Sequence, residues 1–353
     1  MPLEIMDAAG ILPVRLRGVG TEGMGIGDTY FGPFICRFPK ALLQNVGQGR
    51  YRFLDGAVIS TGCDALRRMD DCWRKAGEDI PGIVPSFFHY FDVPQKVEAH
   101  ARQWFSGQIR KLIRAVEEHF GVRVSDEALK EAIRMRNRIR VLLWKLEGLR
   151  RRPGSEVSGA EAFGAVIAGA VLPPELFEQE LAAWIAELEE GAQQESRPRP
   201  RILVGGSVSD DLELINLLEQ AGARVVAENL CFGVRHAEDR VALEGDPVDN
   251  LTARYLSESV CPRMFGNYKT RFKLLREKAR DAGADAVILE NVRFCDLHAS
   301  ENGLLEHDFE KMGIPCMRLE REYGPLSEGG RLNMRITAFL ENLQWRKGVR
   351  RAS

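Results

Sequence analysis

Several features that would assign the chain to a large protein class are missing from its sequence. No apolar run approaches the roughly 20 residues that a helix needs to cross a membrane. The first residues, MPLEIMDAAG, contain no basic segment followed by an apolar one, so we expect a cytoplasmic protein without a membrane partner. No GxxxxGK[ST] phosphate loop is present, and nothing in the sequence supports ATP hydrolysis by this polypeptide.

Neither sign of charge predominates. The chain has 49 Lys and Arg against 51 Asp and Glu, and its formal net charge is -2. A protein whose main partner is a polyanion normally carries an excess of positive charge, so we expect no nucleic-acid partner. The 353 residues, 44% of them hydrophobic, are enough for two or three domains with buried cores.

The cysteines lack the paired spacing of structural zinc sites, because no CxxC or CxxxC motif occurs. An odd number of cysteines without a secretion signal also argues against a disulfide framework. Two interpretations remain: thiols that pack separately in cores, or scattered ligands that the fold brings together. The seven residues are Cys36, Cys63, Cys72, Cys231, Cys261, Cys295 and Cys316.

The C-terminal half predicts strands that alternate with helices. Such alternation is typical of βαβ units and of a doubly wound parallel sheet. The expected strands are 200–207, 223–230, 284–292 and 314–322, and the expected helices are 210–222, 270–283, 305–313 and 333–343.

The N-terminal half carries a weaker version of the same pattern, followed by a helical region. A polar segment at 192–201 is the expected linker. The fold class is therefore α/β, with two doubly wound, Rossmann- or flavodoxin-like parallel-sheet domains, at 1–96 and 199–353, and a helical segment between them at 97–191. The expected strands are 10–16, 53–62 and 86–94, and the expected helices are 96–121, 125–152 and 174–191.

Most of the cysteines fall where ligands are expected in such a fold. Cys63, Cys231 and Cys295 follow predicted strands, and ligands of parallel sheets gather beyond the carboxyl ends of the strands. Cys36 and Cys261 lie in loops that lead into helices, where a thiolate is favoured. Thiolates from distant segments are the ligands of iron–sulfur clusters, so the pattern favours a metal centre.

Taken together, these segments resemble a known family: the iron–sulfur, D-type component of the 2-hydroxyacyl-CoA dehydratase and benzoyl-CoA reductase superfamily, in its double-cubane cluster protein branch. The resemblance covers nearly the whole chain and rests on the order and spacing of its segments. They are FICRFPKALLQ, FLDGAVISTGCDALRRMDDCWR, YFDVPQK, SDEALKEAIRMRNRIR, RILVGGSVSDDLELINLLEQAGARVVAENLCFGVRH, AVILENVRFCDLHASENGLLEHDFEKMGIP and NMRITAFLENL.

The resemblance implies a set of metal ligands. It places the three-cysteine cube of the family on Cys36, Cys63 and Cys295. The segments NLCFGVRH and SVCPRMF resemble the branch in which one sulfide joins two cubes, so Cys231 and Cys261 are expected as further metal ligands.

The number of cubes stays open. Two cubes with three thiolates each require six ligands, and Cys72 or Cys316 would have to supply the sixth. Cys316 lies within a predicted strand, where we expect core packing. The expected cofactor is therefore an iron–sulfur cluster, either an 8Fe-9S double cubane or a single 4Fe-4S cube.

The resemblance also implies an activity and partners. It implies an oxygen-sensitive reductase component that receives electrons at very low potential from a separate ATP-dependent iron–sulfur activator protein, and that forms a homodimer. The alternative is the single-cube subunit of a heterodimeric 2-hydroxyacyl-CoA dehydratase or aryl-CoA reductase, beside a paralogous subunit. A non-catalytic scaffold is the alternative from another class. The sequence assigns neither the catalytic residues nor the substrate, a CoA thioester or a small molecule.

A few further side chains have two interpretations each. His89 and His298 could donate protons near a cluster, or be ordinary core or surface residues. Arg235 and Arg263, which follow Cys231 and Cys261, could balance cluster charge or pair with surface carboxylates. The basic run 134–140 could bind a CoA phosphate, or form ion pairs on a helix face.

Overall fold

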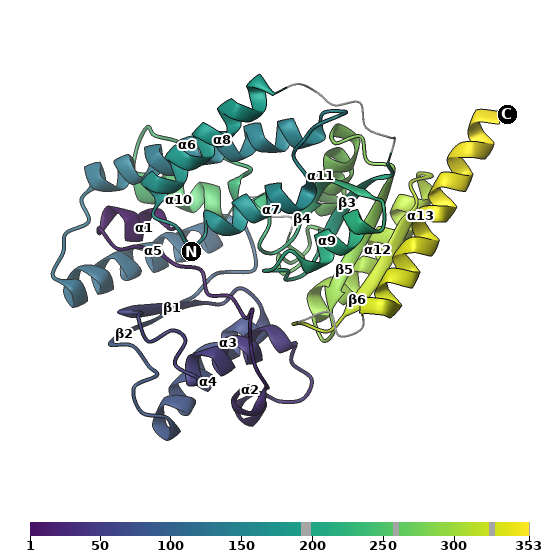
Figure 1. Cartoon of the computed structure of the whole chain (residues 1–353). Coiled ribbons are helices and arrows are strands. Elements are labelled where there is room, and N and C mark those ends of the chain that lie inside the picture. Colours follow the sequence, from purple (N-terminus) through teal and green to yellow (C-terminus); the bar gives the residue numbers. More distant parts are fainter. Residues whose placement is uncertain (192–198, 257–260, 325–328, 353) are drawn as a thin grey trace. The chain divides into compact units, whose positions relative to one another are not determined.

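The chain of the computed structural model divides into two compact units (Figure 1). Unit 1 comprises Met1–Arg138 and Asp239–Asn267, and unit 2 comprises Ile139–Glu238 and Tyr268–Ser353. The structure describes residues 1–191, 199–256, 261–324 and 329–352.

The unit boundary at Arg138 falls inside a helix, α6 (Asp126–Arg151). The sequence boundaries at 96, 191 and 199 stay a prediction about domains. Most of the linker expected at 192–201 lies outside the described residues.

Unit 1 is built on a two-stranded parallel sheet. Strands β1 (Gly56–Ser60) and β2 (Phe87–Phe91) pair in register, and α4 (Asp64–Asp79) connects them. The strand expected at 10–16 is wrong, because a loop runs there. Pro13 lies in its middle, and proline can donate no hydrogen bond to a strand ladder. The other helices that lie wholly in this unit are α1 (Glu4–Ala8), α2 (Gly25–Tyr30), α3 (Arg37–Gly47), α5 (Ala99–Phe120) and α10 (Pro247–Tyr255).

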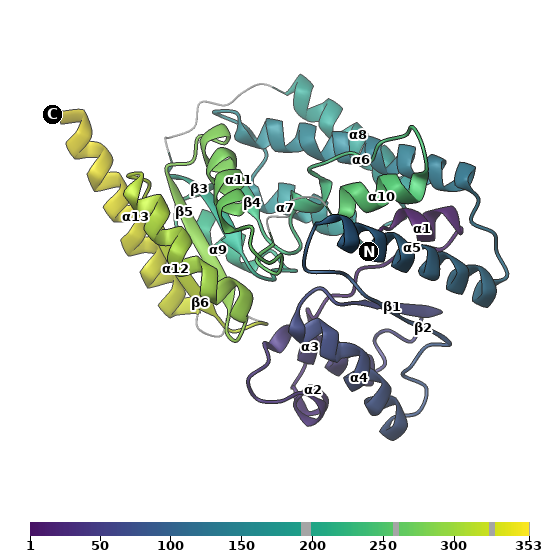
Figure 2. The same ribbon diagram turned by 180° about the vertical axis from the view of Figure 1, so that it is seen from behind.

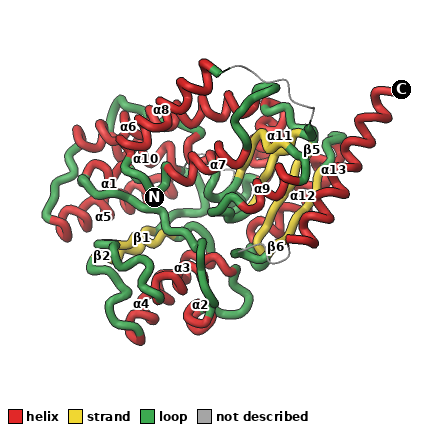
Figure 3. Tube along the Cα trace, viewed as in Figure 1, coloured by secondary structure: helices red, strands yellow, loops and turns green. Residues whose placement is uncertain are grey.

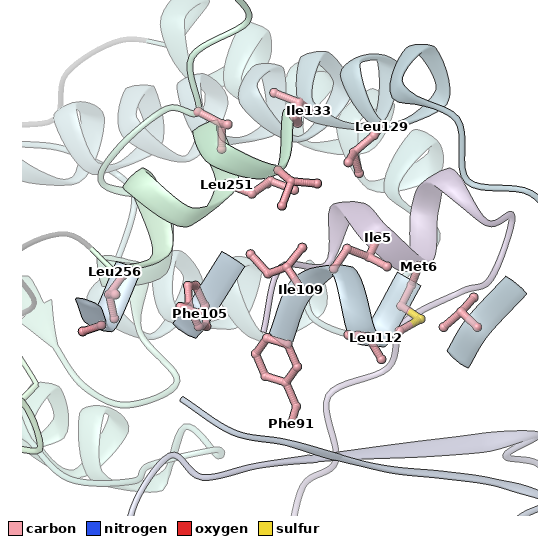
Figure 4. Close-up of a cluster of buried hydrophobic side chains, with 14 of the residues drawn as sticks. Ile5, Met6, Phe91, Phe105, Ile109, Leu112, Leu129, Ile133, Leu251 and Leu256 are labelled. Carbon is pink, nitrogen blue, oxygen red and sulfur yellow. The ribbon is translucent and has the colours of Figure 1, made fainter. Parts of the chain in front are cut away.

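The core of unit 1 draws side chains from distant parts of the sequence (Figure 4). Helices α1, α5 and α10 and the first part of α6 face one another there, beside the end of β2. Residues 239–267 thus belong to the N-terminal unit because α10 completes its core. The labelled members are Ile5, Met6, Phe91, Phe105, Ile109, Leu112, Leu129, Ile133, Leu251 and Leu256.

Unit 2 contains a four-stranded sheet whose order is β4-β3-β5-β6, with every neighbouring pair parallel. Figure 3 shows the strands in yellow among the helices, with β5 and β6 labelled. The strands are β3 (Arg201–Gly206), β4 (Arg224–Asn229), β5 (Ala286–Val292) and β6 (Cys316–Arg321). Strand β3 has β4 on one side and β5 on the other, which makes the carboxyl ends of β3 and β5 the topological switch point.

Helices cover the sheet of unit 2. Helices α11 and α12 share one apolar core with strands β3 to β6, and Figure 2 shows them beside these strands. Helix α9, which connects β3 to β4, contacts β4, α7 and α13. The helices are α7 (Gly159–Ala168), α8 (Pro174–Glu190), α9 (Glu213–Gln220), α11 (Tyr268–Asp281), α12 (Asp296–Lys311) and α13 (Gly329–Ala352), with a 3-10 turn, η1, at Val234–Ala237.

The expected fold class is confirmed: two parallel sheets alternate with helices, and a helical region lies between them in the sequence. Helices α7 and α10 were not expected, and α12 begins at Asp296, nine residues before the helix expected at 305–313. None of the helices in the described ranges is long and apolar enough to cross a membrane.

Candidate metal centre

Three cysteines occupy the same structural position. Cys36, Cys63 and Cys295 are the N-cap residues of α3, α4 and α12. Serine, threonine, aspartate and asparagine are the usual N-cap residues, so three cysteines at this position are unexpected for helix stability alone. The backbone N–H groups and dipole of a helix N-terminus favour negative charge, which lowers the cost of a thiolate.

In unit 1, Cys63 follows β1 by a short turn. Its Sγ atom accepts a hydrogen bond from the backbone N–H of Leu66, with 3.4 Å between the atoms. This bond uses the thiol as an acceptor, as metal coordination also does. Cys36 is buried at the start of α3, and the loop before it comes from α2. Cys36 agrees with the expected loop that leads into a helix, and Cys63 follows a strand as expected, while the helix α4 directly after Cys63 was not among the expected helices.

Arg263 clamps the carboxyl end of the unit 1 sheet. Its Nη1 donates to the carbonyl of Pro94 at 2.8 Å and its Nη2 to that of Val93 at 2.5 Å. The backbone N–H of Val93 donates in turn to Thr61 Oγ1 at 2.7 Å. The clamp therefore joins the loop that follows β2 to the loop that leads from β1 to Cys63.

The same arginine is electrostatically linked to two thiols. Burial lowers the pKa of Arg263, while Cys261, Asp92 and Cys63 act in the opposite direction. The charge-balancing interpretation of Arg263 thus has physical support, and the chain brings this residue from about 170 positions away in sequence.

In unit 2, a tight turn presents Cys295. The backbone N–H of Cys295 donates to the carbonyl of Val292 at 2.9 Å. Within this turn Phe294 has a φ of 64°, the only positive value of a non-glycine residue among the described residues. Backbone strain of this kind gathers at functional sites, since stability alone would favour glycine.

Cys231 follows β4 and lies beside two basic side chains. Arg235 Nη2 donates to Cys231 Sγ at 3.2 Å, and His298 Nε2 lies 3.9 Å from the same sulfur. Burial, then Arg235 and Arg271, lower the pKa of His298 to about 3. The ring is therefore neutral at pH 7 and is placed to orient Cys231, one helical turn after the N-cap of α12.

Two buried glutamates hold the thiol loops of unit 2, and the sequence interpretation missed both. Glu228 accepts hydrogen bonds from the N–H groups of Leu230 and Val234 on either side of Cys231, at 3.0 and 2.5 Å. A Cβ atom on Gly233 would lie 1.7 Å from the Glu228 carboxylate, so only glycine fits there.

Glu290 has the equivalent place at the end of β5. It accepts hydrogen bonds from Ser207 and Arg321. Burial raises the pKa of both glutamates, although the positive charge of Lys278 lowers the pKa of Glu228 and that of Arg321 lowers the pKa of Glu290. The sequence did carry a signal, because Glu-Asn followed by Leu or Val ends both strands, at 228–230 and 290–292.

The two remaining cysteines have different surroundings. Cys72 lies within α4 and donates its S–H to the carbonyl of Tyr30 at 3.3 Å, and burial raises the pKa of its thiol. Cys316 is part of the apolar core of unit 2, as expected, and burial raises its pKa strongly. Neither position favours a thiolate.

Two other expectations concern charged and titratable groups. In the basic run, Arg136 forms a buried bidentate pair with Asp7, with N–O distances of 2.6 and 2.7 Å, and Arg134 pairs with Glu131 at 2.6 Å. These two arginines have the ion-pair role that was the alternative to phosphate binding. His89 lies in the middle of β2, stacked on Phe87.

The expected ligands divide between the units, with Cys36, Cys63 and Cys261 in unit 1 and Cys231 and Cys295 in unit 2. In the described ranges no group of three or more His, Cys, Asp or Glu side chains could by itself hold a metal ion. The five thiols nevertheless fit an iron–sulfur cluster in chemistry, since each lies in a loop or at a helix N-terminus. The full ligand set stays a prediction.

Comparison with known proteins identifies the family. The sequence profile of the family "HGD-D: 2-hydroxyglutaryl-CoA dehydratase, D-component" matches residues 1–343. This match includes both sheets and all seven cysteines.

Individual relatives cover most of the chain. A benzoyl-CoA reductase subunit of Thauera aromatica is 28% identical over 322 residues, which are 89% of this chain and 81% of that protein. The (R)-phenyllactyl-CoA dehydratase beta subunit of Clostridium sporogenes is 24% identical over 348 residues, 97% of this chain and 89% of that protein. The putative dehydratase subunit YjiM of Escherichia coli (strain K12) is 28% identical over 360 aligned residues, with the same two shares.

Proposed function

The chain belongs to the 2-hydroxyglutaryl-CoA dehydratase D-component family, whose members include dehydratase and reductase subunits, and we propose that it is an iron–sulfur subunit of this kind. Its cluster would be held by Cys36, Cys63 and Cys295. Its substrate would be a CoA thioester, as the names of the relatives indicate for those proteins.

One observation carries the proposal: each of these three cysteines is the N-cap of a helix. A thiolate is the form that binds iron, and a helix N-terminus stabilises it before any metal arrives. A single such cysteine would say little. Three at equivalent junctions, two of them after parallel strands, agree with a common role.

The cluster would supply single electrons at low potential to the substrate. The chain's own residues have simpler tasks. The three N-cap thiols bind metal, Arg263 and Arg235 place positive charge near the neighbouring thiols, and His298 keeps a neutral ring against Cys231. Hydrogen bonds and burial around such thiols are what tunes the reduction potential of a cluster.

Partner proteins are part of the proposal. The relatives are themselves named as subunits, three of them as beta subunits, which supports a paralogous partner for this chain. We also propose an ATP-dependent iron–sulfur activator as the electron donor, because the sequence has no phosphate loop of its own. A homodimer is the competing assembly.

A second candidate is a double-cubane reductase, in which Cys231 and Cys261 bind a further cube. The observation in its favour is that each of these two loop thiols has an arginine within a few residues, one of them in direct contact. The sixth thiolate is the difficulty, since Cys72 donates its proton to a carbonyl and Cys316 is buried in a core.

Anaerobic purification followed by iron and sulfide analysis tests both candidates. The first predicts a brown protein with about four iron atoms per chain, the content of one cube. About eight iron atoms per chain in a self-associated dimer would favour the double cubane. A folded protein that stays colourless after anaerobic reconstitution would contradict both and leave the non-catalytic scaffold.

A further inference from the structure

Ser207 lies at the end of β3, between the two loops of unit 2 that carry thiols. Its side chain is fully buried. Every polar atom of the residue takes part in a hydrogen bond to β5 or to the loop after β4.

The bonds on one side lead to Cys231. The carbonyl of Ser207 accepts the backbone N–H of Cys231 at 3.0 Å. Because a backbone group makes this contact, the position of Cys231 follows the position of the Ser207 peptide.

The bonds on the other side lead to Cys295. Ser207 Oγ accepts the backbone N–H of Val292 at 2.8 Å, and the carbonyl of Val292 accepts the N–H of Cys295 at 2.9 Å. The serine hydroxyl is thus the first link of a two-bond chain to the turn that presents Cys295.

A buried ion pair fixes the serine itself. Ser207 Oγ donates to Glu290 Oε2 at 2.9 Å, and the backbone N–H of Ser207 donates to the same oxygen at 3.0 Å. The other carboxylate oxygen, Oε1, accepts from Arg321 Nε at 2.9 Å. Gly206, with a φ of 149°, permits this approach, since a Cβ atom there would lie 2.0 Å from the Glu290 carbonyl oxygen.

We infer that Ser207 is a positioning residue that sets the Cys231 and Cys295 loops of unit 2 relative to each other. It acts through Val292 and through its own backbone carbonyl, and touches no substrate. The part of this inference that concerns the cluster rests on the proposed function. The part that concerns the two loops can be tested without metal.

The loop provides its own matched control. Ser209 lies two residues further on, is equally buried, and its hydroxyl makes no hydrogen bond among the described residues. Ser207→Ala and Ser209→Ala therefore remove the same atom from the same loop, and only the first removes bonds to Val292 and Glu290.

Amide hydrogen exchange of the metal-free protein is the first measurement. In Ser207→Ala the amide of Val292 should exchange roughly fivefold to tenfold faster, as expected when a buried hydrogen bond is lost. In Ser209→Ala it should exchange as in the wild type. Equal exchange in the two variants would overturn the inference. Should Ser207→Ala not fold, Ser207→Cys supplies the comparison, because sulfur is a weaker acceptor and faster exchange is again expected.

The second measurement uses the loaded protein and separates positioning from simple loss of stability. Val287→Ala, a buried substitution at the other end of β5, serves as a variant with a comparable loss of thermal stability. Ser207→Ala should lose iron to a chelator roughly tenfold faster and shift the reduction potential, as outer partners of metal ligands do. Val287→Ala and Ser209→Ala should keep the wild-type potential. A shift of the reduction potential in Val287→Ala as large as that in Ser207→Ala would contradict the inference. A wild-type protein that binds no iron would refute the proposed function, and the amide exchange of Val292 would then decide whether Ser207 positions the loop.

Discussion

The two units place thiols at the same point of a parallel sheet and hold them by different means. In unit 2 the holding groups are Ser207, Glu228 and Glu290, all fully buried. In unit 1 the corresponding work is done by a clamp of Arg263 and Thr61, and Arg263 is only half-buried. The unit 2 loops are thus fixed by buried groups of their own sheet, while the unit 1 loop depends on Arg263, about 170 positions away in the sequence.

For Ser207 and Glu290 this difference follows from the size of the sheets, while Glu228, on the edge strand β4, is bonded to the turn that it holds. Strands β3 and β5 have neighbours on both sides, so polar groups at their ends are enclosed and must be paired with one another. Strands β1 and β2 form a sheet of two, whose carboxyl ends are covered by the loop that carries Arg263. We therefore expect unit 2 to respond more strongly when a holding group is removed.

The largest effect is expected from Arg321→Met in unit 2. The substitution leaves the Glu290 carboxylate buried without its ion-pair partner, which should cost about 3–5 kcal/mol in the free energy of unfolding. Arg318→Met, three residues earlier than Arg321 on β6, breaks a pair with Glu306 whose arginine is 54% exposed and should cost under about 1 kcal/mol. Thermal and urea unfolding measure both, and equal costs would break the comparison.

A smaller effect is expected from Arg263→Met in unit 1. The clamp loses its hydrogen bonds to Pro94 and Val93, which should cost about 1–2 kcal/mol because the guanidinium is partly solvated. Arg102→Met is the control, since Arg102 also donates to a backbone carbonyl, that of Val97, but is exposed. If Arg263→Met lowered the free energy of unfolding by more than Arg321→Met does, unit 1 and not unit 2 would be the more sensitive to the loss of a holding group.

The smallest effect concerns the pH dependence that His89 contributes in unit 1, beside the larger one expected from His298 in unit 2, whose pKa is lowered to about 3. Burial, and then Lys111, lower the pKa of His89 in β2. The folded protein binds this proton less readily than the unfolded chain, so stability should fall as pH drops below the ordinary histidine pKa of about 6.5. His89→Phe should remove part of this slope in the profile of unfolding temperature against pH and leave the part due to His298, and a profile identical to that of the wild type would contradict the contribution of His89.

The fold was predictable where local signals agreed. All four strands of unit 2 were expected, because apolar runs bounded by glycine or polar turns have few other solutions. The prediction of a strand at 10–16 was wrong because the apolar residues there suggest a strand, whereas Pro13 cannot donate a hydrogen bond to a neighbouring strand. Helix α7 was missed although it begins with a capping box of Ser158 and Glu161, a signal that the sequence does contain.

The candidate site was predictable only in part. Sequence patterns placed Cys36 before a helix and Cys63 and Cys295 after strands, but the helix that begins directly after Cys295 was expected only at 305–313. The contacts of Arg263 join residues about 170 positions apart, and no local sequence pattern predicts such contacts. The role of Ser207 also needs the register of β3 and β5, which periodicity alone does not supply.

The central claim is that helix N-cap thiols, and not the core thiols, bind iron. Cys295→Ser and Cys316→Ser test it most directly, since both cysteines adjoin strands of the unit 2 sheet and only Cys295 caps a helix. After anaerobic reconstitution, iron content and visible absorbance should be lost or strongly reduced in Cys295→Ser, with helical circular dichroism unchanged, while Cys316→Ser should keep its iron and lose only thermal stability. A Cys295→Ser protein that holds as much iron as the wild type would contradict the account.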